Sequence, residues 1–412
     1  MAQMSSKPVR GTRDILPDEM LIRDTLEQKI LSIYRAHGFT RMETPALENI
    51  DLLLGSDGGE NLKMIFAILK RGEKLKVDEN STAADLCDMG LRYDLTLPLS
   101  RFYSNHAESL ELPFKAIQIG NVFRAERPQK GRFRSFKQCD IDIIGDPTVA
   151  AEMELITTTA KALLAIGFEG FTIKVNDRKL LTAAIIQAGF APGDVGSVCI
   201  SLDKADKIGT AGVVTELVEK GYDTAMVSDF VNKASGITLD NIEDLVDEPE
   251  AVADLRRVIG TVEKMAGGRY TIAFDFTLIR GMGYYTGQVF EVSYGEYGAS
   301  IAGGGRYDEM IGKYAKQSVP AVGFSIGFER IVGILMDAEE TQSAGKHPVA
   351  LFYTPADDMA EVITFADGLR AQGHWVNLVS MKKKFGKQLS HYEEKGYAGF
   401  LVYGRDEGIK TF

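Results

Sequence analysis

Hydrophobic residues recur at two spacings along this chain, and each spacing predicts a different secondary structure. After Pro17, leucine and isoleucine residues return every three or four positions until Gly38, which predicts an amphipathic helix with a stop signal at its end. The following run FTRMET indicates a strand that ends at Pro45. Residues 55–90 are rich in glycine and charged residues, and we expect a loop-rich excursion there with a weak helical stretch near KMIFAILKRG.

Two strand-like runs within residues 113–145 are joined by the charged turn RPQKGRF, which predicts a long antiparallel hairpin. Side chains alternate between the two faces of a strand. In the second run the odd positions are apolar and predict a core face: Cys139, Ile141 and Ile143. The even positions carry one aromatic ring and three polar groups and predict a polar surface: Phe136, Gln138, Asp140 and Asp142.

Helical and strand patterns alternate in blocks over the rest of the chain. We expect a helix over 147–166 and a helical subdomain over 176–267, inserted between strands that rejoin one sheet. The later strands are expected at RYTIAFDF, YYTGQVFEVSY and AVGFSIG, the last of which leads into a helix FERIVGILM. After a polar stretch, alternating strands and helices predict a small separate α/β domain. The predicted boundaries are 1–175 and 268–338 for the two parts of a main domain, 176–267 for the insertion and 346–412 for the last domain.

Composition narrows the classes of protein that fit. The 412 residues, 45% hydrophobic and 25% charged, are typical of a soluble globular protein with two or three domains. A net charge of -11 gives no general attraction to nucleic acid, so any such contact must be local. Three widely spaced cysteines favour neither a disulfide framework nor a zinc site, and the five histidines show no ligand spacing. No apolar run has the length of a membrane span or the features of a signal peptide, so we expect a cytoplasmic protein without membrane contact.

Charged residues concentrate at the hairpin turn although the protein is acidic overall. Six of them fall within eleven residues: Arg124, Glu126, Arg127, Lys130, Arg132 and Arg134. A guanidinium presents a planar fork of donors that suits phosphate oxygens, so the cluster suggests a polyphosphate site. The alternative is a solvated hairpin tip. The polar groups in the middle of the neighbouring strand disfavour it, because burying them without partners is costly.

Three glycine-containing segments add further candidates. RGMGYYTG puts Arg280 before Tyr284 and Tyr285, so a cation and two phenols would approach a ligand together; a plain glycine-rich turn is the alternative. SIAGGGRYDEMI lacks the Gly-Lys-Ser/Thr ending of a P-loop, and its glycines would let backbone pass close to a ligand. GFSIGFERI places Arg330 near a helix N-terminus, where an anion is favoured, and a surface arginine is the alternative.

Six ordered segments together resemble the class II aminoacyl-tRNA synthetases, in the form seen in histidyl-tRNA synthetases. RAERPQKGRFRSFKQCDIDIIG resembles motif 2, and GFSIGFERI resembles motif 3. RGMGYYTG and GGGRYDEM resemble the two histidine motifs of the family, and RGTRDILPDE and LRYDLTLPLSRF are also similar to it. Gly283 is a departure, since many members carry an acidic residue at that position.

The resemblance implies an α+β fold with three parts. These are a six- or seven-stranded antiparallel catalytic sheet flanked by helices, a helical insertion between motifs 2 and 3, and a C-terminal α/β anticodon-binding domain. That last domain is expected to be short, because roughly one more strand and a helix would follow GFLVYGRDEGIKTF. Motif 1, placed at the first helix and FTRMETP, implies a homodimer. The implied reaction activates histidine with ATP and magnesium, releases pyrophosphate and transfers histidine to the terminal ribose of histidine tRNA.

The resemblance also implies roles for single residues. Catalysis would rest on Arg124 and Arg280, which would hold the α-phosphate from opposite sides. The residues that would bind ATP are Arg124, Glu126, Arg132, Phe136 and Arg330. Those that would bind histidine are Asp94, Thr96, Arg124, Gln138, Asp142, Arg280, Tyr284 and Tyr285. The tRNA acceptor end would meet Gln129, Lys130 and Arg134, and no resident metal of the protein is expected.

Two other functions compete with this interpretation. The first is a synthetase-like regulatory subunit of histidine biosynthesis, which would bind histidine and control a partner enzyme. Such paralogues typically lose motif arginines and the anticodon domain. This chain has most of the C-terminal domain and keeps the arginines Arg124, Arg132, Arg280 and Arg330. The second is a pure RNA-binding module, which would not need a pocket of tyrosines and carboxylates.

Overall fold

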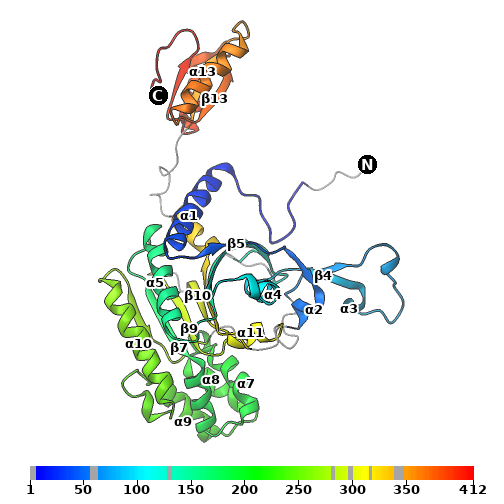
Figure 1. Ribbon diagram of the computed structural model, residues 1–412, viewed down its shortest axis with the longest axis vertical. Coiled ribbons are helices and arrows are strands. Elements are labelled where there is room, and N and C mark those ends of the chain that lie inside the picture. Colours follow the sequence, from blue (N-terminus) through cyan, green and yellow to red (C-terminus); the bar gives the residue numbers. More distant parts are fainter. Residues whose placement is uncertain are drawn as a thin grey trace. The chain divides into compact units, whose positions relative to one another are not determined.

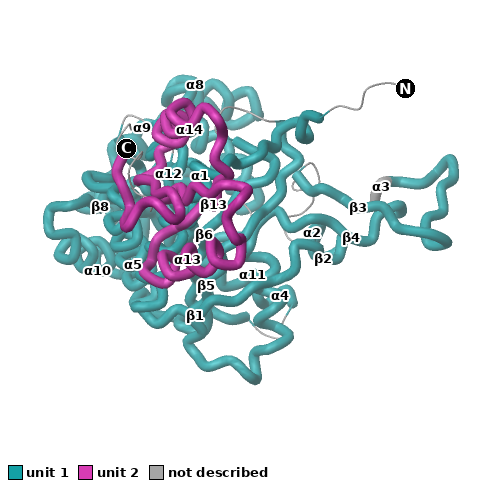
Figure 2. The backbone as a smooth tube through the Cα atoms, turned by 90° about the horizontal axis from the view of Figure 1, so that it is seen from above, with its two compact units in different colours: residues 1–337 teal, residues 338–412 magenta. Residues whose placement is uncertain are grey.

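The computed structural model describes residues 6–55, 64–127, 132–279, 284–295, 300–314, 318–337 and 348–412. The chain divides into two compact units, residues 1–337 and 338–412 (Figure 2). Across the described ranges, none of the helices combines the length and the apolar character that crossing a bilayer requires.

An eight-stranded mixed sheet forms the centre of the first unit (Figure 1). From edge to edge its strands are β1 (Thr40–Arg41), β5 (Phe114–Phe123), β6 (Ser135–Ile144), β11 (Ala321–Gly327), β10 (Ser300–Arg306), β9 (Gln288–Ser293), β7 (Thr172–Asp177) and β8 (Thr271–Phe274). Neighbours from β5 to β7 pair antiparallel, while β1 and β8 pair parallel at the two edges. The expected six or seven antiparallel strands are therefore six, and the two parallel edge strands bring the sheet to eight.

The predicted hairpin and the two faces of its second strand are confirmed. β5 and β6 pair antiparallel along their whole length. Cys139 and Ile141 of β6 lie in the same hydrophobic core as Leu26 of α1 (Pro17–Ala36) and Leu155 of α5 (Ala150–Ala165). Because side chains alternate along a strand, the even residues of β6 point to the other face of the sheet. One face is therefore packed under helices, and the other is available for chemistry.

The segment predicted as helical carries five α-helices: α6 (Arg178–Gln187), α7 (Val195–Leu202), α8 (Ala205–Glu219), α9 (Thr224–Ser235) and α10 (Pro249–Ala266). Their buried residues, such as Leu181, Phe230 and Val258, belong to the same hydrophobic core as the sheet. The helical character is confirmed, and these helices are part of the same compact unit as the sheet (Figure 1).

A smaller three-stranded sheet lies in the excursion before the hairpin, in the order β2 (Leu47–Asn49), β4 (Cys87–Leu91) and β3 (Ala67–Leu69). The helical stretch expected near KMIFAILKRG is wrong, because β3 lies there and pairs antiparallel with β4. An apolar run this short fits a helix or a strand equally well, and a partner later in the chain decides.

Shorter helices connect these elements. The α-helices are α2 (Ile50–Leu54), α3 (Ala83–Leu86), α4 (Thr96–His106), α11 (Asp308–Gly312) and α12 (Phe328–Asp337). The 3₁₀ helices are η2 (Gly72–Lys74), η3 (Ala107–Ser109), η4 (Pro192–Asp194) and η5 (Ile242–Asp244).

The second unit alternates strands and helices as predicted: β12 (Val349–Tyr353), α13 (Met359–Ala371), β13 (Val376–Ser380), α14 (Phe385–Glu394) and β14 (Gly399–Val402). Its three strands form a parallel sheet in the order β13-β12-β14. Leu351 of β12 and Val362 of α13 are buried in one core of this unit, which makes it a small α/β domain.

Candidate active site

A cavity of about 940 Å³ is lined by residues of β6, β10 and β11. All four even residues of β6 face it: Phe136, Gln138, Asp140 and Asp142. Gly196 and Ile200 of α7 also line it, so the helical segment reaches the cavity. The alternation of one strand thus brings an aromatic ring, an amide and two carboxylates into one space.

Three arginines of the cavity come from different elements. Arg124 follows β5, and its Nε donates a hydrogen bond of 3.0 Å to the carbonyl of Tyr93. Its guanidinium carbon lies 5.0 Å from the centroid of the Phe136 ring, a cation–π distance. Arg330, in the first turn of α12, donates to the carbonyl of Ser300 on β10. Arg132, on the other arm of the hairpin turn, is exposed, so the three cations together suit a ligand with phosphate groups.

Buried ion pairs fix the start of α12 against α1. Arg23 is only 2% exposed and forms ion pairs with Glu329 and, at 2.8 Å, with Glu19. Glu329 also accepts a hydrogen bond of 3.2 Å from the backbone N–H of Lys137 in β6. Removing one partner of such a buried pair leaves an uncompensated charge. These contacts therefore hold Arg330, the next residue, in position.

Asp142 lies near the end of β6, lines the cavity and is 2% exposed. Its Oδ1 accepts a hydrogen bond of 2.6 Å from the Tyr307 hydroxyl, while Oδ2 has no hydrogen-bond partner. Burial raises the pKa of Asp142 to about 7; the Tyr307 hydrogen bond opposes that rise and the charge of Asp94 adds to it. The backbone of Gly323 passes beside this carboxylate, and a Cβ there would overlap it. The position therefore needs glycine.

Buried acceptors without partners gather beside Asp142. They are Oε1 of Gln138, Oδ1 of Asp140 and Oδ2 of Asp142, all from residues that line the cavity. Burial raises the pKa of Asp140 well above its usual range, and the negative charge of Asp142 raises it further. Gln138, Asp140 and Asp142 form the acceptor-rich floor of the cavity. A buried acceptor without a hydrogen bond is costly, so this floor suits a ligand that brings several N–H donors or a positive charge.

Two adjacent tyrosines, Tyr284 and Tyr285, form one side of the cavity, the tyrosine wall. The rings of Tyr284 and Tyr285 lie 4.5 Å apart between centroids, and the Tyr284 hydroxyl donates to the Tyr285 hydroxyl at 3.4 Å. Tyr284 also meets Tyr307 edge to face at 6.5 Å. A flat ligand ring with polar atoms would find both aromatic faces and hydroxyl groups here.

Among the residues that the structure describes, no group of three or more His, Cys, Asp or Glu side chains is arranged to hold a metal ion.

A family model described as histidyl-tRNA synthetase matches residues 11–331, which is most of the chain. The chain belongs to the histidyl-tRNA synthetase family. A histidine–tRNA ligase of Leifsonia xyli subsp. xyli is 42% identical and covers 97% of this chain and 95% of its own length. A probable histidine–tRNA ligase of Tropheryma whipplei is 36% identical over 97% of this chain and 96% of its own.

Solved structures have the same fold. The crystal structure of a histidyl-tRNA synthetase from Nostoc sp. PCC 7120 is 26% identical, with a TM-score of 0.81 over 98% of this chain and 93% of that one. A chain from Bacillus halodurans described as an ATP phosphoribosyltransferase regulatory subunit/histidyl-tRNA synthetase has a TM-score of 0.80 at 21% identity, over 97% of this chain and 98% of that one. At that identity the likeness concerns the fold alone.

Most residues that the family resemblance assigned to the site meet in the cavity: Asp94, Thr96, Arg124, Glu126, Arg132, Phe136, Gln138, Asp142, Tyr284, Tyr285 and Arg330. Arg280, Gln129 and Lys130 lie outside the described residues, so their assigned roles stay predictions. Arg134 donates through Nε to the carbonyl of Glu126 at 3.0 Å and through Nη1 to the carbonyl of Arg10 at 3.3 Å. It therefore braces the hairpin against the N-terminal segment, and its contact with tRNA also stays a prediction.

The sequence predictions give no role to Tyr307 or Asp140, although both line the cavity. Tyr307, which follows the glycine run and Arg306 in GGGRYDEM, lines the cavity and donates a hydrogen bond to Asp142. Asp140 was placed on the polar face but was given no role, although its carboxylate is buried in the cavity lining. The signal for Asp140 was its even position in β6, and for Tyr307 it was a hydroxyl beside glycines that open space.

Proposed function

We propose that this protein is a histidine–tRNA ligase that activates histidine with ATP and then charges histidine tRNA. The observation that carries the proposal is that one cavity combines three arginines and Phe136 with an acceptor-rich floor and a tyrosine wall. The first set suits ATP and the second suits histidine. Family membership and the named relatives support the same reaction.

ATP would be held by the cationic and aromatic groups of the cavity. Arg124 and Arg132 would bind phosphates, Glu126 the amino edge of adenine, and Phe136 with Arg330 the faces of the adenine ring. Magnesium would enter bound to the phosphates of ATP, because hard cations prefer oxygen ligands and the described residues offer no ready three-ligand site.

Histidine would occupy the acceptor-rich floor. Its α-ammonium group would bind Asp94, Thr96 and Gln138, and its imidazole would lie among Asp142, Tyr284 and Tyr285. We add Asp140 as a further acceptor for the positive end of the ligand, because its buried Oδ1 has no partner. A site of buried hydrogen-bonding groups rejects ligands that leave them unpaired by about 10⁴-fold or more.

The residues of the cavity would promote the reaction by position and charge. The histidine carboxylate attacks the α-phosphate of ATP, and the bond to pyrophosphate breaks. Arg124, held at Nε by Tyr93, would stabilise the negative charge that develops on the phosphorus-bound oxygens. Arg280 is expected to act from the opposite side, and the tRNA acceptor end is expected at Gln129 and Lys130. No residue is required as a general base in this step.

Other parts of the chain would serve the same reaction. The segment 176–267 would act as the insertion domain of a catalytic domain formed by 1–175 and 268–338, and the α/β domain 346–412 would bind the anticodon. A homodimer would form through α1 and β1. The expected setting is the cytoplasm.

The alternative is the regulatory subunit of histidine biosynthesis that binds histidine without activating it. Arg124, Arg132 and Arg330 all lie in the cavity, which favours the ligase because a histidine-binding regulator has no need of a triphosphate site. Exchange of labelled pyrophosphate into ATP, measured with each amino acid in turn, distinguishes the two. A ligase should show this exchange when histidine is the amino acid and with no other amino acid. Histidine binding without exchange at saturating ATP and magnesium would support the regulator.

A further inference from the structure

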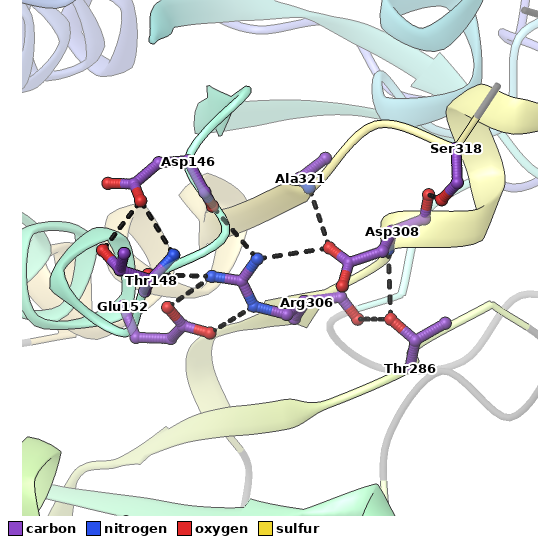
Figure 3. Close-up of polar contacts among 8 residues, drawn as sticks. All are labelled: Asp146, Thr148, Glu152, Thr286, Arg306, Asp308, Ser318 and Ala321. Atoms are coloured by element: carbon purple, nitrogen blue, oxygen red, sulfur yellow. Dashed lines mark hydrogen bonds and ion pairs between the residues drawn. The ribbon is translucent and has the colours of Figure 1, made fainter. Parts of the chain in front are cut away.

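A buried arginine outside the cavity connects several segments of the chain (Figure 3). Arg306 ends β10 and is 8% exposed, and its Nε and Nη2 each donate at 2.6 Å to the carboxylate of Glu152 in α5, which is 0% exposed. A bidentate pair of this kind fixes the orientation of both side chains as well as their separation.

All five N–H donors of Arg306 are used (Figure 3). Besides the two bonds to Glu152, Nη1 donates at 3.2 Å to the carbonyl of Asp146 and to Oδ1 of Asp308, and Nη2 donates at 3.2 Å to the carbonyl of Thr148. A lysine has three donors and no planar fork, so it cannot make this set of contacts.

Asp308 extends the network to two more segments. Its Oδ1 accepts a hydrogen bond of 2.9 Å from the backbone N–H of Ala321, the first residue of β11. Its own backbone N–H donates at 3.1 Å to the hydroxyl of Thr286, whose backbone N–H in turn donates at 2.8 Å to the carbonyl of Arg306. The side chain of Arg306 therefore joins the loop after β6, α5 and Asp308, whose carboxylate contacts the start of β11. The segment after Tyr285 is joined through the backbone of Arg306 and Asp308.

Arg306 itself and three of these segments, but not α5, lie close in sequence to residues of the proposed histidine site. Tyr307 follows Arg306, Tyr285 precedes Thr286, and Gly323 lies near the start of β11. Asp142 lies in the last part of β6, just before the loop that Arg306 holds. The network thus meets the cavity at the hydrogen bond between Tyr307 and Asp142 and at the tyrosine wall.

We propose that Arg306, paired with Glu152, is a positioning residue that sets the geometry of the histidine site without touching histidine. This inference rests on the proposed function, because it assigns the floor and the tyrosine wall to histidine. Its consequence is selective: a disturbed network displaces Tyr307 and Tyr285, whereas the contacts of Arg124 with Tyr93 and of Arg330 with Ser300 are built from other segments.

The test measures dissociation constants for histidine and for ATP separately, with Arg306→Lys and Glu152→Gln as variants. We expect the constant for histidine to rise about tenfold or more, since small displacements of positioned groups are costly, and that for ATP to change less than about twofold. Glu154→Gln is the matched control. Glu154 lies in α5, like Glu152, but forms an ion pair of 2.5 Å with Lys115, and neither Glu154 nor Lys115 lines the cavity. Both constants should stay unchanged in the control.

A double-mutant cycle tests whether Arg306 acts through Tyr307. If it does, Arg306→Lys combined with Tyr307→Phe weakens histidine binding little more than Tyr307→Phe alone, because coupled residues are not additive. Losses that multiply would overturn the assignment.

The remaining outcomes separate this inference from the proposed function. Wild-type protein without histidine-dependent exchange would contradict the proposed function. If the wild-type protein is active but its variants lose affinity for ATP and for histidine equally, the positioning role alone would be overturned. The same holds if the variants keep both affinities. If Arg306→Lys fails to fold, Glu152→Gln decides, and failure of both to fold would make the pair a structural element and overturn the proposal.

Discussion

The hydroxyl of Tyr307 donates a 2.6 Å hydrogen bond to Asp142 across 165 residues of sequence. Asp142 lies in β6 and Tyr307 directly after β10, and β11 lies between these strands in the sheet. The contact is possible because Gly323 of β11 stands between them without a side chain: a Cβ there would overlap the carboxylate and come within 3.3 Å of the Tyr307 ring. A glycine in one strand thus lets two neighbours form one wall of the cavity.

Gly323→Ala should therefore damage histidine binding more than ATP binding. The added methyl group must displace Asp142, so we expect the histidine dissociation constant to rise by about tenfold or more, as for misplaced binding groups in general. Isothermal titration with each ligand checks this. The control is Gly368→Ala in α13, where nothing lies within 4 Å of an added Cβ, and both affinities should stay unchanged there. Normal histidine affinity in Gly323→Ala would mean that the tight contact has no role in the site.

Asp142→Asn should weaken histidine binding by about 1.5 to 3 kcal/mol, the scale of a hydrogen bond to a charged group. The amide replaces an acceptor oxygen with a donor and cannot serve an imidazole N–H in the same way. ATP affinity should change much less, since Asp142 lies on the acceptor-rich floor. Equal losses for the two ligands would mean that Asp142 supports the sheet and not the ligand.

The raised pKa of Asp142 predicts a pH dependence of stability. Burial moves this pKa from 3.8 to about 7, so between these values the folded protein holds a proton that the unfolded chain releases. The unfolding free energy from this group therefore falls as pH rises from about 4 to 7. Asp142→Asn should show a smaller decrease over that range in urea unfolding without ligands. Asp94 and Asp140 remain in both proteins, but the charge of Asp142 also raises the pKa of Asp140. The difference between the two curves therefore reports Asp142 together with its effect on Asp140; identical slopes would contradict the raised pKa of Asp142.

Glu329→Gln should destabilise the protein, because Arg23 is buried and loses one of its two charged partners. The expected cost is about 1 to 3 kcal/mol, the range for a buried polar group left unsatisfied. Chemical denaturation measures it, with Glu243→Gln as control, because the exposed pair of Glu243 and Arg256 should contribute at most about 1 kcal/mol. A similar loss of stability in both variants would contradict the claim that the buried ion pairs of Arg23 fix α12.

Arg280→Ala should slow adenylate formation by about 10²-fold or more in a single turnover, the scale for loss of one preorganised donor. Arg280 lies outside the described residues, and the prediction rests on its place in RGMGYYTG. Dissociation constants for histidine and ATP should change much less, since the interaction is made chiefly in the transition state. The variant must first be shown to be folded. Normal activation with lost ATP affinity would assign Arg280 to ground-state binding.

The sequence predicted the polar face of β6 because alternation is a local property of one strand. Phe136, Gln138 and Asp142 reach the cavity on that basis alone. The arginine cluster at the hairpin turn suggested a polyphosphate site from the residues alone, but the roles of single arginines required the family resemblance. The periodicity of hydrophobic residues likewise predicted the helical segment 176–267.

Long-range pairings could not be predicted in this way. The bond between Tyr307 and Asp142 depends on the order of three strands, and that order is not written in any single segment. The pair of Arg306 and Glu152, 154 residues apart, likewise arises only when β10 lies beside α5. The mistaken helix near β3 has the same cause, because its partner β4 decided its structure.

Formation of histidyl-adenylate in the cavity is the central claim, and a single-turnover experiment with labelled ATP tests it most directly. Enzyme in excess over ATP, mixed with histidine and magnesium and quenched in acid, should yield labelled histidyl-adenylate together with one pyrophosphate for each ATP consumed. Asp142→Asn should reach the same yield only at higher histidine concentration. Tight binding of both histidine and ATP by the wild-type protein, with no adenylate at any time, would contradict the account.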